Sequence, residues 1–284
     1  MENQKQNKNS HLIYSNFASS WVRKGGTVWL YSDPHFGDMD MYKLRFPKEF
    51  KFKGEIAPTD DWVVEQLDMK QVSNINRFVG KNDTIIFLGD IGNVEPIKKV
   101  RGYKVLIMGN HEHGASNYKR VVKVDCLYGD LGDVSEAIKS HFKDANLTPA
   151  EEIIKLGYKP TNVVNVFGKR YQRITDNHLF DEVYEGPLFI NDRLILSHIP
   201  IPYLCNCFFN IHGHKHDNKE EAFNYLNICA EHTNYNPVNL FKLLREGLLS
   251  KIVPLNRMTI DMATQRKYNN LKKNCIISRN KKKS

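Results

Sequence analysis

Five short apolar runs in this chain each end in residues that can bind a metal ion. The runs GTVWLYS, TIIFLG, YKVLIMG, LILS and FFNIHG are each followed at once by aspartate, asparagine or histidine. Runs of this length, bounded by turn residues, are typical of buried strands. In open α/β sheets, groups just beyond the carboxyl ends of the strands form the binding site. The chain is therefore expected to fold so that these strand ends converge.

The candidate ligands at these strand ends are carboxylates, imidazoles and one amide. They are Asp33, His35, Asp90, Asn110, His198, His214 and His216. Such a mixture suits divalent ions such as Mn, Fe, Zn, Ni or Co, and no cysteine belongs to it. The groups are too many for one tetrahedral ion, so two ions that share a bridging carboxylate are expected. Asp33 and His35 alternate at a strand end, which predicts that both face the same way.

Helical patterns alternate with the first three strands. A helix is expected from Asp60 or Asp61 to about Val79, and a short one within residues 94–102. The stretch from 33 to 60 is interpreted as a long loop. Alternating strands and helices predict an α/β layered fold.

The middle of the chain has a weaker pattern, and the strands then resume. Residues 112–185 are interpreted as an insertion with helices near 134–143 and 149–156, and the rest of it is left unassigned. A hairpin is expected over 186–198, with its turn at Asn191 and Asp192. Further strands are expected at 208–216 and from 224, followed by a turn at 236–237.

The motifs themselves resemble those of a known superfamily. SDPHFGD, FLGD, MGNHE, LSHIP and HGHKH occur in the order D-x-H, G-D, G-N-H-[DE], H and G-H-x-H, between Asp33 and His216. This arrangement resembles the calcineurin-like metallophosphoesterases, and most of all the small bacterial and phage phosphoesterases that open with SDxHFGH. The resemblance implies a layered β-sandwich flanked by helices, in α/β/β/α order. One domain is expected over residues 1–240, followed by a basic extension over 241–284.

The resemblance assigns roles to the matching residues. Asp33, His35 and His216 would hold one ion. Asn110, His198 and His214 would hold the other, and Asp90 would bridge both. A water or hydroxide between the ions would attack the phosphorus of a phosphoester. The resemblance names His111 and Asp90 as catalytic, with His111 contacting the phosphate or protonating the leaving oxygen.

Differences between these motifs and those of related enzymes indicate the class of substrate. GDIGNVE lacks the second aspartate and the arginine of the G-D-x-x-D-R-G motif of phosphoprotein phosphatases. We therefore expect phosphodiester or nucleotide substrates in preference to phosphoproteins. Asp38 stands where the phage-type opening has histidine, which predicts a changed substrate contact. Glu112 is expected to orient His111 or a metal ligand.

Positive charge is concentrated at the end of the chain. The net charge is +9, but residues 240–284 hold twelve Lys or Arg and two acids, so the remainder sums to −1. A basic extension can bind nucleic acid or remain solvated and disordered. A nuclease that uses this extension is therefore an alternative function, and a non-catalytic binding protein is a second one.

The remaining features indicate a cytoplasmic protein. The five cysteines show no framework spacing, no secretory leader is expected, and no apolar run is long enough to cross a membrane. The pair Cys205 and Cys207 is interpreted as ordinary buried thiols, with metal binding as the alternative. Structural roles are expected for His113, His178, His212 and His232. Six basic residues could contact phosphate or nucleotide, but a solvated surface position is expected for each: Arg45, Lys119, Arg120, Lys169, Arg170 and Arg173. The sequence does not indicate an oligomeric state.

Overall fold

A computed structural model describes residues 21, 26–51, 58–129, 154–165, 168–190, 193–217 and 222–253. Its first sheet has five strands in the order β12-β1-β2-β3-β7. Four of them are parallel: β1 (Val28–Tyr31), β2 (Thr84–Phe87), β3 (Tyr103–Ile107) and β7 (Glu182–Tyr184). The two-residue strand β12 (Val238–Asn239) pairs antiparallel with β1.

The second sheet has four strands in the order β11-β10-β9-β8. Its parallel strands are β9 (Leu194–Leu196), β10 (Phe209–His212) and β11 (Tyr225–Asn227), and β8 (Leu188–Phe189) lies antiparallel to β9. The expected hairpin is confirmed by the β8–β9 pairing, while its turn at Asn191 and Asp192 lies outside the described residues.

Two buried clusters follow from the alternation of side chains along the first sheet. One cluster joins this sheet to the second and includes Leu30, Ile86, Val105, Leu196, Phe209 and Ile211. The other joins the opposite face to helix α3 (Asp60–Phe78) and includes Tyr31, Ile85, Phe87, Leu106, Val72, Ile75 and Val79. The molecule is therefore a mixed α/β structure with the first sheet covered on both faces.

The helices differ from the expectation in two places. The stretch predicted to be a long loop contains helix α2 (Met39–Arg45), because Asp38 caps its first turn by accepting from Met41 N at 3.0 Å and Tyr42 is fully buried. Helix α3 is confirmed, but its cap is Thr59, which accepts from Trp62 N at 3.2 Å. The short predicted helix is the 3₁₀ helix η1 (Pro96–Lys99).

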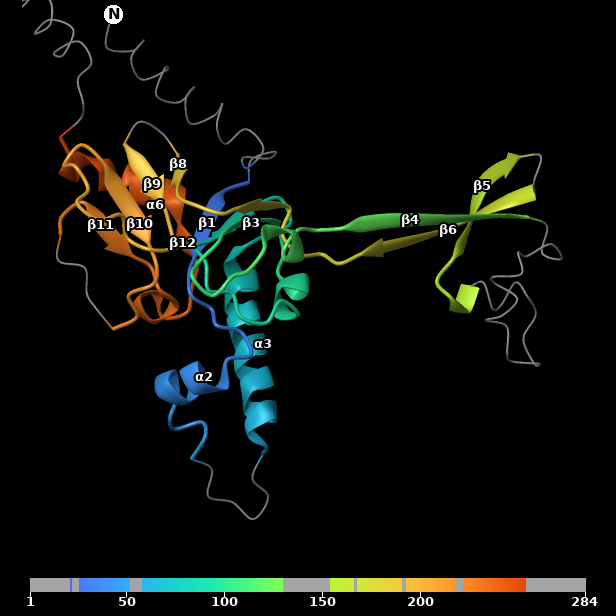
Figure 1. Cartoon of the computed structure of the whole chain (residues 1–284), viewed down its shortest axis with the longest axis horizontal. Coiled ribbons are helices and arrows are strands. Elements are labelled where there is room, and N and C mark those ends of the chain that lie inside the picture. Colours follow the sequence, from blue (N-terminus) through green and yellow to red (C-terminus); the bar gives the residue numbers. More distant parts are fainter. Residues whose placement is uncertain are drawn as a thin grey trace, which may run out of the picture.

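The insertion is expected to be helical, but its described part, for most of which the sequence predicts no element, is mainly a sheet. It contains an antiparallel sheet in the order β4-β6-β5, formed by β4 (Val122–Gly129), β5 (Lys159–Asn165) and β6 (Gly168–Asp176). This sheet, the arm, extends away from the two parallel sheets (Figure 1). Val122, Val124 and Ile174 are exposed, and the buried cluster of the arm is small, formed by Tyr158 and Tyr171 with Leu127 and Leu156 against them. Its strands therefore show little of the apolar alternation that marks a strand in sequence. The expected helix near 134–143 lies outside the described residues, as does most of 149–156.

The described chain ends on the core of the parallel sheets. Helix α6 (Leu240–Arg245) and the 3₁₀ helix η4 (Leu248–Lys251) place Leu240, Leu248 and Ile252 in the cluster between the sheets. The basic residues after 253 lie outside the described part. In the part of the chain that is described, no helix combines the length and apolar character needed to cross a bilayer.

Candidate metal centre

The predicted ligands follow strand ends of both parallel sheets and meet between them. Among the described residues, three overlapping groups each bring one ligand atom per residue within 4.8 Å of one another: Asp33–His35–Asp90, Asp90–His198–His214, and Asp33–His216–Cys229. The first two groups share Asp90, and the first and third share Asp33. Buried clusters of this composition can bind a metal ion.

Four of the predicted ligands have a left-handed backbone. The φ angles are 55° at Asp33, 48° at His35, 52° at Asp90 and 70° at His214. This region is uncommon for residues other than glycine, and such outliers concentrate at functional sites. Hydrogen bonds from Asp33 N to Gly89 O (3.2 Å) and from His35 N to Asp90 O (3.1 Å) hold the loop after β1 against the loop after β2. The backbone thus turns at Asp33 and His35 and does not continue as the strand from which their common direction was predicted.

His198 presents one ring nitrogen to the site. Its Nδ1 lies 2.8 Å from the carbonyl oxygen of Leu88, which can only accept, so Nδ1 carries the proton in the neutral ring. The other nitrogen, Nε2, lies 2.8 Å from Asn110 Oδ1, 3.2 Å from His214 Nδ1 and 3.3 Å from Asp90 Oδ2. Mostly acceptor atoms therefore converge where a cation would balance them.

The pKa of His198 depends on the carboxylates beside it. Burial is the largest single influence and lowers this pKa, but Asp90 and Asp33 together raise it by more, so the pKa lies above its usual range. Burial raises the pKa of Asp90, but His198, the His111 backbone nitrogen and His35 together outweigh it, so the pKa of Asp90 is lowered. The negative charge of Asp90 and Asp33 can thus be balanced either by a proton on His198 or by a bound cation.

His35 contributes a buried nitrogen without a hydrogen-bond partner. Its Nε2 has no such partner among the described residues and lies 3.7 Å from Asp90 Oδ2. Burial lowers the pKa of His35, and Arg45 lowers it further, which favours the neutral ring that a metal requires. Asp38 Oδ2 lies 3.5 Å from Nδ1 of the same ring. An unpaired buried imidazole nitrogen beside a carboxylate fits a metal ligand.

His216 is held by Glu231, a residue outside the predicted ligand set. Its Nδ1 lies 2.9 Å from Glu231 Oε1, and its Nε2 lies 3.6 Å from Asp33 Oδ1. Glu231 is the main influence on the pKa of His216 and raises it. Because a carboxylate accepts from Nδ1, it leaves Nε2 as the nitrogen that can bind an ion.

Arg45 links this carboxylate to the loop after β1. It donates from Nε to Glu231 Oε1 (2.5 Å), from Nη2 to Asp33 O (2.9 Å) and from Nη1 to Pro34 O (3.1 Å). Its side chain is 2% exposed, so the expectation of a solvated cation is wrong. The carboxylate of Glu231 offsets the charge that makes this burial costly.

Asp33 is oriented by several donors. Its Oδ2 accepts from the Ser32 hydroxyl, from the Cys229 thiol at 3.3 Å and from His214 N at 3.1 Å. Burial and the nearby carboxylate raise the pKa of the Cys229 thiol, so it acts as a donor. The predicted set contains no cysteine. Cys229 and Glu231 follow the end of β11, so the rule that found the other strand ends applies to them as well.

Glu112 is buried against the loop that carries Asp90, whereas the ring of His111 is exposed beside Asp90. Glu112 is buried and accepts from the backbone nitrogens of Asp90 (2.9 Å), Ile91 (2.7 Å) and Gly109 (2.5 Å), so it fixes the loop that carries Asp90. The His111 side chain is 63% exposed, with Nε2 3.8 Å from Asp90 Oδ2. It lies beside the ligand groups and remains accessible to solvent.

The other histidines lie outside these groups. His212 is fully buried, and its ring packs edge-on against Tyr225 at 5.9 Å between centroids. His113 and His232 are exposed, and the side chain of His178 is 58% exposed. None of these four belongs to a described ligand group.

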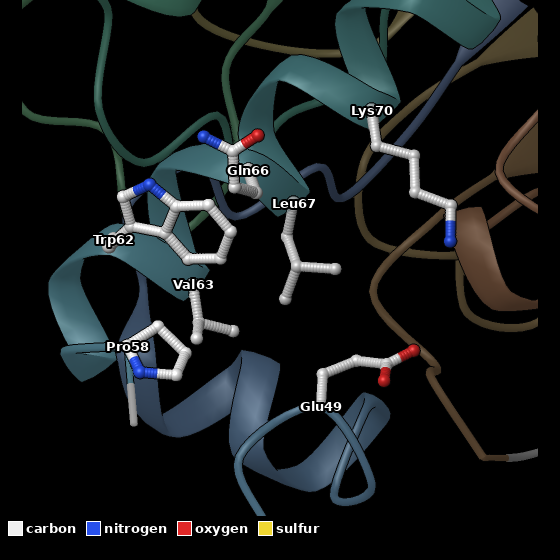
Figure 2. Close-up of a pocket in the computed structure, with 7 residues that line it drawn as sticks. All are labelled: Glu49, Pro58, Trp62, Val63, Gln66, Leu67 and Lys70. Carbon is white, nitrogen blue, oxygen red and sulfur yellow. The ribbon is translucent and has the colours of Figure 1, made fainter. Parts of the chain in front are cut away.

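A separate hollow of about 560 Å³ lies along the first half of α3. In Figure 2, Trp62, Val63 and Leu67 of α3 line it on one side, with Glu49 across from them. Its described lining is Glu49, Pro58, Trp62, Val63, Gln66, Leu67 and Lys70. Since it includes none of the predicted ligands, it is not part of the metal centre.

Comparisons with known proteins add little to this geometry. The chain matches no family model, and no curated protein matches it. Among solved structures, the crystal structure of the protein of unknown function AQ665 from Aquifex aeolicus is similar, with a TM-score of 0.42 and 18% sequence identity. The match covers 78% of this chain and 98% of that one. A similarity at this level assigns neither a fold nor a function.

Proposed function

We propose that this protein is a dinuclear metal-dependent phosphoesterase of the calcineurin-like kind. The observation that carries the proposal is the pair of ligand groups that share the buried carboxylate of Asp90. Two ions joined through one carboxylate are an arrangement that suits hydrolysis of phosphate esters. The layered sandwich of that superfamily is part of the same proposal.

In this proposal the ligands divide into two sets around Asp90. Asp33, His35 and His216 hold one ion, and Asn110, His198 and His214 hold the other. The unpartnered Nε2 of His35 and the acceptor atoms around His198 Nε2 support this division. When bound, the ions would lower the pKa of a water molecule and neutralise charge on the phosphoryl oxygens.

His111 serves as the group that acts on the substrate. Its exposed ring lies next to Asp90, and its backbone nitrogen donates to Asp90 Oδ1 at 3.2 Å. An imidazole in this place can donate a hydrogen bond to a phosphoryl oxygen or protonate the leaving oxygen. The buried Glu112 keeps the loop of Asp90 in place through three backbone nitrogens.

The proposed substrates are phosphodiesters or nucleotides. The absence of the G-D-x-x-D-R-G motif supports this choice over phosphoproteins. Asp38 is engaged at the cap of α2 and beside His35, so it does not replace the substrate contact of a histidine at that place. The alternatives of a nuclease anchored by its basic extension and of a non-catalytic binding protein rest on residues or properties outside the described structure.

The proposal is tested by measuring the metal content of the purified protein together with its turnover of phosphoesters. Protein freed of metal by chelation is expected to be inactive on bis-p-nitrophenyl phosphate, and Mn²⁺ is expected to restore activity at about two ions per chain. Absence of turnover with Mn²⁺, Fe²⁺, Co²⁺, Ni²⁺ or Zn²⁺ across mono- and diesters would contradict it.

A further inference from the structure

Two cysteine thiols are in contact in the loop that connects β9 to β10. Cys205 and Cys207 have their Sγ atoms 3.0 Å apart. Cys205 is exposed, whereas Cys207 is 7% exposed. The expectation that both are ordinary buried thiols is therefore wrong for Cys205. The proposed phosphoesterase chemistry does not use either of them.

The backbone of this loop is fixed on several sides. Phe208 N donates to Cys205 O at 2.9 Å, which closes a turn around the pair. Leu204 N donates to the Tyr225 hydroxyl at 3.2 Å, and Asn206 O accepts from Val253 N at 3.1 Å. These bonds restrict both flanks of the turn, so the folded chain holds the two thiols together.

The two thiols are not equivalent. Their contact lowers the pKa of Cys205 and raises that of Cys207. The thiolate is the nucleophile in thiol chemistry, so the accessible Cys205 is the group that attacks first. Cys207 lies within reach of the Cys205 sulfur for the second attack.

We propose that Cys205 and Cys207 form a redox-active dithiol that reacts with low-molecular-weight disulfides such as oxidised glutathione. The Cys205 thiolate attacks one sulfur of the small disulfide, forms a mixed disulfide and releases one thiolate. The Cys207 sulfur then attacks the Cys205 sulfur, which forms the Cys205–Cys207 disulfide and releases the second thiolate. The protein loses two electrons and two thiol protons, and the small disulfide is reduced to two thiols.

The other described cysteines provide internal comparisons. Cys229 is fully buried and donates to Asp33. Cys126 is partly exposed on the arm and accepts from Arg170 at 3.0 Å, with no second thiol beside it among the described residues. A reaction at Cys126 can therefore stop at the mixed disulfide, whereas the reaction at Cys205 proceeds to ring closure.

Mass spectrometry of the full-length protein treated with oxidised glutathione tests the proposal. After alkylation and trypsin, residues 194–215 form one peptide whose cysteines are Cys205 and Cys207. In the native protein this peptide is expected to lose two hydrogens and retain no glutathione. C207S should retain one glutathione on Cys205. In C205S, the remaining thiol of Cys207 should react at least about tenfold more slowly than Cys205 does in the wild type.

Three outcomes would overturn the proposal. They are retention of glutathione on the wild-type peptide without ring closure, a faster reaction at Cys126 than at Cys205, and ring closure in urea as fast as in the folded protein. The last outcome would show that the folded loop does not bring the thiols together. C126S is the matched control, and its dithiol should react as in the wild type.

Discussion

Nε2 of His198 lies 2.8 Å from Oδ1 of Asn110, although the two residues are 88 positions apart in the sequence. His198 donates from its other nitrogen to Leu88 O, so in the neutral ring Nε2 and the amide oxygen face each other as acceptors. Such a contact is favourable when a cation or a proton lies between them. It connects the end of β9 with the end of β3 and brings the two parallel sheets together at the proposed centre.

Replacing Asp90 by asparagine (D90N) is expected to remove most of the bound metal and most of the phosphoesterase activity. An amide carries no negative charge with which to bridge two cations. Metal content per chain and turnover of bis-p-nitrophenyl phosphate measure both effects. The control is E95Q, which removes the exposed carboxylate that pairs with Lys98 and should change neither. Two ions per chain in active D90N would show that the ligand assignment is wrong.

Replacing His111 by alanine (H111A) is expected to lower kcat about 10²–10⁴-fold while the metal content stays the same. The exposed ring lies beside the ligands and can act on the substrate without holding an ion. H113A removes an exposed histidine two residues away and should retain the wild-type rate. Loss of metal in H111A would place the ring among the ligands instead.

Replacing Glu231 by glutamine (E231Q) is expected to weaken Mn²⁺ binding about 10–100-fold, because the carboxylate that receives the Nδ1 proton of His216 is lost. Titration calorimetry of the metal-free protein measures this without reference to turnover. E246Q changes an exposed glutamate of similar charge and should bind Mn²⁺ as the wild type does. Equal affinities in both variants would mean that Glu231 only balances the charge of Arg45.

Replacing Gly213 by alanine (G213A) is expected to destabilise the fold by about 1–3 kcal/mol, because its Cβ would overlap Ser32 Oγ and Asp33 Oδ2. Chemical unfolding of the metal-free protein measures the change. At Gly186 an added Cβ would meet no atom within 4 Å, so G186A should stay within about 0.5 kcal/mol of the wild type. Equal stability of the two variants would contradict the close packing at Asp33.

The base of the arm is expected to loosen in acid. Arg120 donates to Asp176 and lowers the pKa of that carboxyl from 3.8 to about 2. The folded pKa is below the unfolded one, so the stabilisation is present above about pH 4 and is lost as the pH falls towards 2. Hydrogen exchange of β4 and β6, measured between pH 5 and 2, should show this loss, and D176N should remove the pH dependence. An unchanged acid response in D176N would assign the effect to another group.

The sequence alone determined the strand ends and their chemistry. Apolar runs such as Thr84–Phe87 are local and strong signals, and a carboxylate or imidazole directly after them is visible without a structure. The helix near Asp60–Phe78 could also be predicted, because its amphipathic repeat is long. The arm was missed because exposed strands such as β4 lack that periodicity, and α2 was missed because it is short.

The tertiary structure decided how the ligands are grouped and what surrounds them. His216 lies beside Asp33, and Arg45 is buried against Glu231, although the two residues of each pair are far apart along the chain. The left-handed backbone at Asp33 and His35 likewise depends on bonds to the loop after β2. Contacts of this kind join segments whose separate sequences carry no periodic signal. A side chain's chemistry is local and can be read from the sequence, but its partners are fixed only when distant strands come together.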